Sequence, residues 1–216
     1  MSGVPTMTVD DQTTNMRTPQ RRMRRALVRF RGSRDGTAAI EFALLAFPFF
    51  LLIFATIEAF IAFAGEQLLE NAVDTMGRQL RTGQITTFDP TRPTYMDEAQ
   101  FRAKFCEEIS LMITCAAKED ANDQKLYLDV REFANFSSIP NYIPKVSDTQ
   151  FSDLDSTGFD FKPGGPKSIN IVRAYYRWEV MTDLVRPFIT NIRKDGEMPR
   201  DYLMVATAAF RNENYP

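Results

Sequence analysis

A long apolar run near the amino terminus constrains this chain more than any other feature. Between Phe42 and Phe63 the only charged side chain is Glu58. As an α-helix this run covers about 33 Å at about 1.5 Å per residue, which matches a hydrocarbon core of about 30 Å. A helix also satisfies its own backbone hydrogen bonds in lipid. The run, which extends to Ala64, is therefore predicted to span a membrane.

The distribution of charge predicts the orientation of this helix. Residues 1–36 carry eight arginines and three aspartates, a net charge of +5 in a chain of 216 residues with a total of −2, so the remainder carries −7. Arginines beside a membrane helix favour its cytoplasmic side. A cytoplasmic amino terminus and an exported carboxyl-terminal part follow. Such a cluster can also bind nucleic acid, but its position beside a spanning helix is explained more simply as a topology signal.

Residues 1–36 are interpreted as a leader outside the fold. The first 20 residues are rich in Thr, Pro and Asp and poor in apolar side chains, which predicts disorder. An ordinary signal peptide is an alternative, because residues 62–64 form an Ala-Phe-Ala cleavage sequence. The apolar run is long for a signal peptide, whose apolar region has about 7–15 residues. Paired arginines also hint at a twin-arginine signal, although adjacent arginines are expected in so basic a segment.

Glu41, a charged residue at the start of the apolar run, indicates a functional role for this helix. Ionisable groups inside a membrane are costly and are by default paired and functional. Cleavage between Gly36 and Thr37 would create an α-amino group on Thr37, one helical turn from Glu41 or on a neighbouring subunit, and pairing would neutralise both charges. The alternative is a carboxylate in the headgroup layer that complements the helix macrodipole.

The sequence Gly-Thr-Ala-Ala-Ile-Glu-Phe-Ala-Leu-Leu-Ala-Phe-Pro, residues 36–48, resembles the processing site of a type IV prepilin. More narrowly, it is similar to the TadE-like minor pilins, or pseudopilins, of the tight-adherence pilus. The resemblance continues in three further segments, residues 56–58, 67–72 and 205–213. Gly65 departs from the family pattern, in which a bulkier residue is usual, and this puts the continuity of the helix there in question.

The resemblance implies a single-pass protein of the bacterial inner membrane, cleaved after Gly36 by a prepilin peptidase and used to prime, cap or anchor a pilus. Its implied partners are membrane lipid, the peptidase, other pilins or pseudopilins and the pilus assembly platform. It implies no enzymatic activity, cofactor, metal, nucleic acid or small-molecule substrate. The implied organisation is a leader at 1–36, a transmembrane helix at 37–64, a periplasmic extension of the helix at 65–83 and a periplasmic α+β domain at 84–216.

The pattern beyond the membrane predicts this α+β domain. From Glu66 to Arg81 it becomes amphipathic, with apolar residues four apart at Leu68, Ala72, Met76 and Leu80. A second helix is predicted over 96–113 with a capping signal at 94–97. Alternating segments predict strands at 126–131, 172–180 and 202–210. We expect antiparallel pairing rather than βαβ units, because the gaps between the strands are long and mostly not helical.

Two segments of the domain are less regular. Residues 133–167 read as a long loop whose aromatic side chains pack it onto the sheet or, as the alternative, form a partner surface. Residues 183–193 predict a short helix, with Pro187 near its start and Phe188, Ile189 and Ile192 on one side. It faces either the membrane or the pilus base, and the sequence does not choose.

Cys106 and Cys115 are predicted to form a disulfide, because both lie in the exported part. In one helix their Cα atoms would be about 13 Å apart, whereas a disulfide needs less than about 7 Å. The helix must therefore end before Cys115. Closing a loop of about ten residues would contribute about 2.5–3 kcal/mol. Two buried free thiols and a metal pair lacking other ligands are the alternatives.

Glu58 lies about 25 Å along the helix from Glu41. It is interpreted as a solvated carboxylate at the outer membrane interface, and a pairing partner within a fibre is the alternative.

Two other functions compete with a pilin. One is an uncleaved membrane-anchored periplasmic scaffold or sensor. The other is a membrane-tethered hydrolase with paired carboxylates, such as Glu107 and Glu108 or Asp153 and Asp155. Adjacent helical residues point to different faces, and the chain has no histidine, the commonest general base. Both facts count against the hydrolase.

Overall fold

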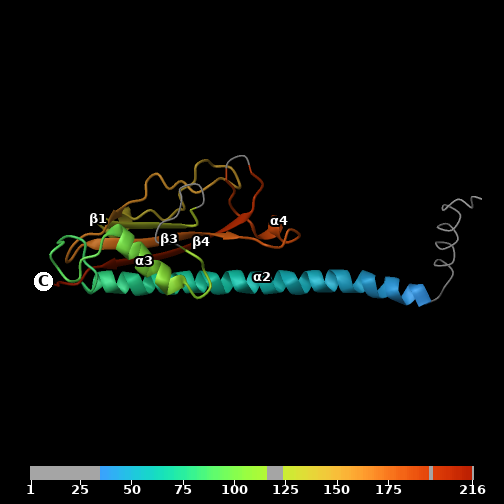
Figure 1. Ribbon diagram of the computed structural model, residues 1–216. Helices are drawn as coiled ribbons and strands as arrows, with labels where there is room; N and C mark the ends of the chain where they lie inside the picture. Colours follow the sequence, from blue (N-terminus) through green and yellow to red (C-terminus); the bar gives the residue numbers. More distant parts are fainter. Residues whose placement is uncertain (1–34, 116–123, 195–196, 216) are drawn as a thin grey trace, which may run out of the picture. The chain divides into compact units, whose positions relative to one another are not determined.

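The computed structural model describes residues 35–115, 124–194 and 197–215, and the side chains from Thr37 onward. In chain order the elements are α2 (Asp35–Arg81), α3 (Glu98–Ile109), β1 (Leu126–Phe133), the 3₁₀ turn η1 (Phe136–Ser138), β2 (Phe161–Lys162), β3 (Ile169–Glu179), α4 (Arg186–Ile189) and β4 (Asp201–Arg211) (Figure 1). A long apolar helix followed by a small, mainly antiparallel sheet confirms the predicted α+β class. Apart from its last two residues, the predicted leader lies outside the described residues.

The chain forms two compact units that divide within α2, between Phe50 and Leu51. In the first unit, the described residues form the amino-terminal turns of α2. Their large apolar side chains are exposed: Ile40, Phe42, Leu44, Leu45, Phe47, Phe49 and Phe50. The helix from Thr37 to Arg81 contains an 18-residue window of mean hydropathy 2.3, none of it buried in the structure. By length and composition, α2 is therefore able to cross a membrane.

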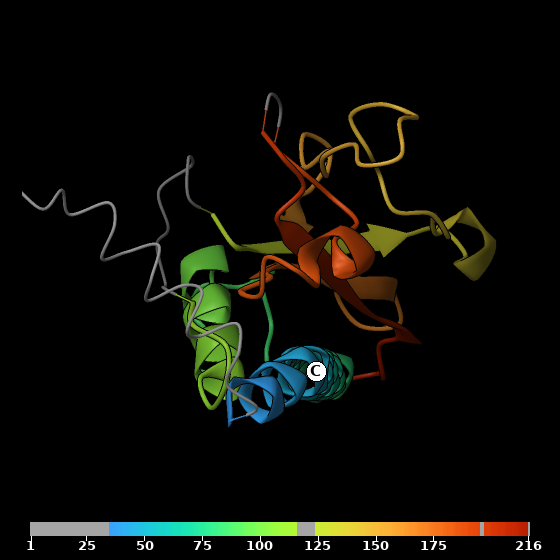
Figure 2. The ribbon, with the colours of Figure 1, turned by 90° about the vertical axis from the view of Figure 1, so that its right-hand side faces the viewer.

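In the second unit, the carboxyl-terminal half of α2 packs with α3 on one face of the sheet, as the end-on view shows (Figure 2). The core between these layers contains Leu69, Val73, Met76 and Leu80 of α2, Phe101, Phe105 and Ile109 of α3, and Leu126, Val130, Val172 and Ala174 of the sheet. The apolar stripe predicted from the four-residue spacing is therefore packing for the protein's own domain.

Two glycines of α2 fix how the helix lies against β4. A Cβ atom on Gly65 would be 3.4 Å from Met204, and one on Gly77 would be 3.3 Å from Ala208. The later residue of the helix lies beside the later residue of the strand, so β4 runs in the same direction as α2. The helix continues through Gly65, where the family pattern left its continuity in question.

The sheet has the order β2-β1-β3-β4. The three predicted strands are present and pair antiparallel, as expected, with Val130 opposite Val172 and Val172 opposite Ala208. The edge strand β2 was not predicted. It has only two residues, too few to show an alternating pattern, and it pairs parallel to β1.

The long loop between β1 and β3 is held to the outer face of the sheet largely by arginines of β3. Arg173 donates from Nη2 to the Pro140 carbonyl at 2.7 Å, and Arg177 forms an ion pair with Asp153. An irregular loop leaves carbonyl groups that need donors, and Arg173 supplies one of these donors, while Arg177 pairs with a carboxylate of the loop. Both arginines are buried.

The expectation that aromatic side chains attach this loop is correct for some of them. Phe159 stacks on Tyr175 with ring centroids 4.8 Å apart, and Phe161 lies 5.1 Å from Phe101. Phe136 and Tyr142 are exposed.

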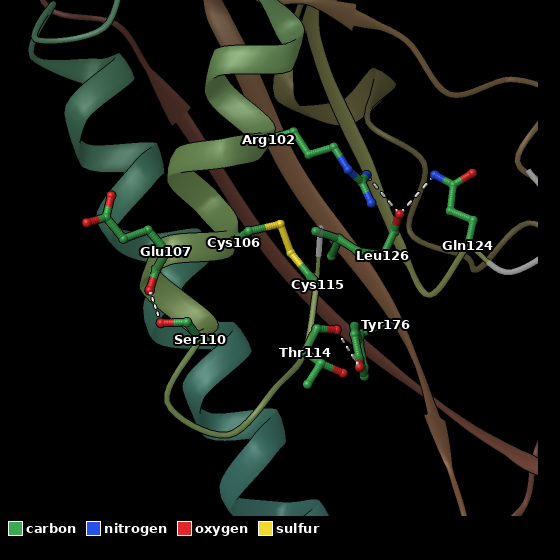
Figure 3. Close-up of a disulfide and its surroundings, with 9 residues drawn as sticks. All are labelled: Arg102, Cys106, Glu107, Ser110, Thr114, Cys115, Gln124, Leu126 and Tyr176. Carbon is green, nitrogen blue, oxygen red and sulfur yellow. Dashed lines mark hydrogen bonds between the residues drawn. A yellow bond between two sulfur atoms is a disulfide. The ribbon is translucent and has the colours of Figure 1, made fainter. Parts of the chain in front are cut away.

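The second helix is shorter than predicted. Asp97, the last residue of the predicted capping signal, is the N-cap of α3, and it forms a capping box with Gln100. The helix ends at Ile109 instead of Ile113, because the chain must turn back for Cys115 to reach Cys106. The predicted disulfide is present, with Cα atoms 5.5 Å apart (Figure 3).

The helix predicted over residues 183–193 is also wrong in length, since α4 contains only four residues. The apolar residues predicted to share one side of this helix do not lie on one face. Ile192 lies beyond the helix and is buried against Tyr175 and Leu203, whereas Phe188 is 87% exposed.

Candidate functional site

The predicted processing residues lie in the first two turns of α2. The helix begins at Asp35, so the backbone at Gly36 and Thr37 is helical. Thr37 and Glu41 are both exposed. Because residues four apart share one face of a helix, Glu41 lies one turn above Thr37 on the same side. A carboxylate so placed can reach an amine on Thr37 or on an adjacent chain.

Glu58 is buried, which corrects the expectation of a solvated carboxylate. The residue is 9% exposed. Its Oε1 accepts a hydrogen bond from the backbone N–H of Met181 at 2.6 Å. The N–H of Thr182 lies 3.3 Å from Oε1 and 3.2 Å from Oε2. The carboxylate is thus bound by two successive amides of the sheet domain, while its depth in a membrane stays a prediction.

The chain presents these two amides because β3 has just ended. The N–H of Val180 still bonds to the Arg200 carbonyl at 3.0 Å, beside β4. Past Val180 the segment leaves the sheet, and the next two N–H groups have no strand partner. Buried backbone donors need acceptors, and Glu58 provides one from the helix.

Residues 181–190, which we call the tip segment, are also ordered by their own contacts. The N–H groups of Val185 and Arg186 both bond to the Thr182 carbonyl at 3.0 Å. Arg186 pairs with Asp183 at 2.6 Å, and its guanidinium donates to the Val180 carbonyl at 3.3 Å. Glu58 therefore contacts a defined turn.

Charge-assisted hydrogen bonds are stronger than neutral ones, so the Glu58 contact joins α2 firmly to the end of β3. Sequence reasoning singled out Glu58 but missed its partners. The bonds cross 123 and 124 positions of the chain, and backbone amides leave no trace in the sequence.

The carboxylate pairs considered for hydrolysis are not arranged for joint acid and base work. Glu107 and Glu108 are exposed on α3. Asp153 is paired with Arg177. The hydroxyl and the backbone N–H of Thr157 both bond to Asp155 and lower its pKa, whereas a general acid needs a raised one.

Within the described residues, no group of three or more His, Cys, Asp or Glu side chains is placed to hold a metal ion. The two cysteines are joined to each other. The turn that carries Cys115 is tied to β3, because the Tyr176 hydroxyl donates to the Thr114 carbonyl at 3.0 Å (Figure 3).

Comparison with known proteins places the resemblance on α2. No match was found among curated proteins or solved structures. A family model described as TadE-like protein matches residues 36–78. The match begins at Gly36, includes Glu41 and Glu58, and ends in the half of the helix that packs against the sheet. Over residues 36–78 this chain is thus similar to the TadE-like proteins, which confirms the resemblance predicted from its sequence.

Proposed function

We propose that this protein is a minor pilin or pseudopilin that acts in assembly of a tight-adherence pilus, by priming, capping or anchoring it. The observation that carries the proposal is the family match, which begins at Gly36, the residue proposed for cleavage. The exposed apolar surface of α2 behind it supports a helix that is first held in lipid and later packed among other helices.

In this proposal Gly36 supplies a small side chain that fits the prepilin peptidase. Cleavage frees the amine of Thr37, and Glu41 pairs with it on a neighbouring subunit to set the register of assembly. The protein is inserted in the inner membrane with its amino terminus in the cytoplasm. The Cys106–Cys115 disulfide supports export of the sheet domain, because disulfides persist outside the cytoplasm.

The test is the length of the membrane-bound protein in cells that assemble the pilus. The wild type should begin at Thr37, whereas Gly36→Arg should accumulate uncleaved because a long cationic side chain replaces the glycine. Gly36→Ala is the matched control and should be largely processed. Intact mass and amino-terminal sequencing read out both.

Normal processing of Gly36→Arg would contradict the proposal. So would a wild-type membrane form that begins with Met1 in piliated cells, and the protein would then be an uncleaved membrane-anchored scaffold or sensor.

A further inference from the structure

The tip segment exposes large apolar side chains. Met181 is 85% exposed, Leu184 57% and Phe188 87%. They project from a turn ordered by its own hydrogen bonds and by Glu58, so their exposure belongs to the fold. Removing each of them from water would be favourable, because burial of apolar surface stabilises. Three exposed apolar side chains in one ordered turn indicate contact with an apolar partner.

The position of the tip segment identifies that partner. The N–H of Met181 is bonded to Glu58, so the segment lies against α2 at that residue. The helix around Glu58 is itself apolar and exposed, at Phe54, Ile57, Phe60 and Ile61. The apolar side chains of the tip therefore continue the surface of the proposed membrane span.

The length of the span places Glu58 near the outer edge of the hydrocarbon. From Thr37 to Ile57 the helix rises about 31 Å, close to the thickness of a hydrocarbon core. Its apolar sequence nevertheless continues to Ala64, about 9 Å past Glu58. Interfacial segments bury their apolar side chains about 5–10 Å into a bilayer, so a turn held at Glu58 lies within that zone.

We propose that the tip segment inserts Met181, Leu184 and Phe188 into the outer leaflet of the membrane that α2 spans. The sheet domain then has a second lipid contact, and Glu58 fixes its depth. The inference depends on anchoring by α2 but not on cleavage after Gly36.

The charge of the tip segment fits a lipid surface. Its one carboxylate, Asp183, is paired with its one cation, Arg186, so the segment is neutral overall. Insertion should therefore be driven by apolar burial and should not require anionic lipid. A second copy of the chain is the competing occupant.

Quenching of tryptophan by brominated lipid tests the proposal in the full-length chain. The only tryptophan, Trp178, is replaced by phenylalanine, and Phe188→Trp is added in that background. The protein is reconstituted in phosphatidylcholine vesicles with and without bromine on the acyl chains. Phe54→Trp, on the span, is the positive control.

Phe136→Trp is the matched negative control. Phe136 is also an exposed phenylalanine of the domain, but it follows the opposite end of the sheet, where Phe133 pairs with Ile169. The 11 residues of β3 separate the two ends by about 33 Å. We expect the bromine-dependent loss of emission from Phe188→Trp to approach that of Phe54→Trp and to exceed that of Phe136→Trp severalfold.

Equal, weak quenching of Phe188→Trp and Phe136→Trp, with Phe54→Trp quenched, would overturn the proposal and leave anchoring intact. Blue-shifted emission from Phe188→Trp without quenching would mean that protein covers the tip, which also overturns it. Absence of quenching in Phe54→Trp would contradict both the membrane span of α2 and the insertion of the tip segment. If the Trp178→Phe background does not form the disulfide, the comparison is made with Trp178 retained and the parent emission subtracted.

Discussion

At the scale of single residues, Glu58 shows how a carboxylate is accommodated on an apolar helix. Its partners are two successive backbone amides at the end of a strand. Removing one partner of a buried hydrogen bond costs more than the bond itself contributes, since the remaining group has lost its water. The same contact orders the tip segment, so one substitution should affect both.

We expect Glu58→Ala to loosen the turn at Met181 and Thr182. The two amides lose their acceptor, which costs about 1–3 kcal/mol and corresponds to about 5- to 150-fold faster hydrogen exchange at these positions. Exchange measured by mass spectrometry or NMR in detergent reads this out. Glu58→Gln keeps an acceptor oxygen and should have a smaller effect. Glu70→Ala, at an exposed position of the same helix, is the control, and unchanged exchange in Glu58→Ala would contradict the assignment.

Asp201, at the start of β4, should give the stability a pH dependence. Burial raises its pKa above the ordinary 3.8, and the nearby Arg177 only partly offsets this. The folded protein thus holds this proton more tightly than the unfolded chain does. The contribution of Asp201 to the free energy of unfolding is therefore present at low pH and falls as the pH rises above about 4.

Asp201→Asn should lack this fall, so its stability relative to the wild type should improve as the pH rises above about 4. Asp155→Asn should differ from the wild type at lower pH, because hydrogen bonds from Thr157 lower the pKa of Asp155. The stability that Asp155 contributes is present above about pH 4 and is lost as the pH falls below it, so the stability of Asp155→Asn relative to the wild type should improve as the pH falls. Denaturant unfolding of both variants and the wild type, at pH values below and above about 4, measures the difference. Parallel curves for the two variants would contradict the prediction.

At the scale of elements, α2 has two halves with different surroundings. Its amino-terminal half exposes apolar side chains on every side, whereas Leu69, Met76 and Leu80 of the other half are buried against the sheet. Gly65 and Gly77 let the packed half approach β4 closely, but to different extents. A Cβ on Gly65 would have ordinary contacts of 3.4 Å, while one on Gly77 would meet the Phe210 ring at 3.0 Å.

Alanine substitutions should therefore differ between these glycines. Gly65→Ala gains helix propensity without crowding and should raise the free energy of unfolding by about 0.5–1 kcal/mol. Gly77→Ala gains the same propensity but pushes on Phe210, so its net gain should be smaller or negative. Thermal and denaturant unfolding in detergent compares the two, and a larger gain for Gly77→Ala would show that the packing is looser than described.

At the scale of the whole molecule, two groups of residues serve separate steps of the proposed function. Thr37 and Glu41 concern processing and registration of the helix, while Glu58 and the tip segment concern how the domain is held near the membrane. A defect in one group should leave the other intact. This separation makes Glu41 testable without disturbing the fold.

Glu41→Ala should insert in the membrane and be cleaved normally, but its incorporation into assembled pili should fall by about tenfold for each 1.4 kcal/mol of pairing lost. Immunoblots of sheared fibres and of membranes measure the ratio of assembled to membrane-bound protein. Glu70→Ala, which changes an exposed carboxylate farther along α2, should assemble normally. Undiminished assembly of Glu41→Ala would mean that this carboxylate only complements the helix dipole.

The sequence by itself determined the long apolar helix, the disulfide and the three long strands, because each depends on local spacing or on the reach of a short loop. Only the tertiary structure decided the features that depend on distant parts of the chain. Arg173 and Arg177 are buried because a loop needs donors, β2 exists because β1 offers it an edge, and α4 is cut to four residues as Ile192 turns into the core. Glu58 is the clearest case, since a periodic pattern reports which face of a helix is apolar but not which backbone amides, 123 residues later, will meet it.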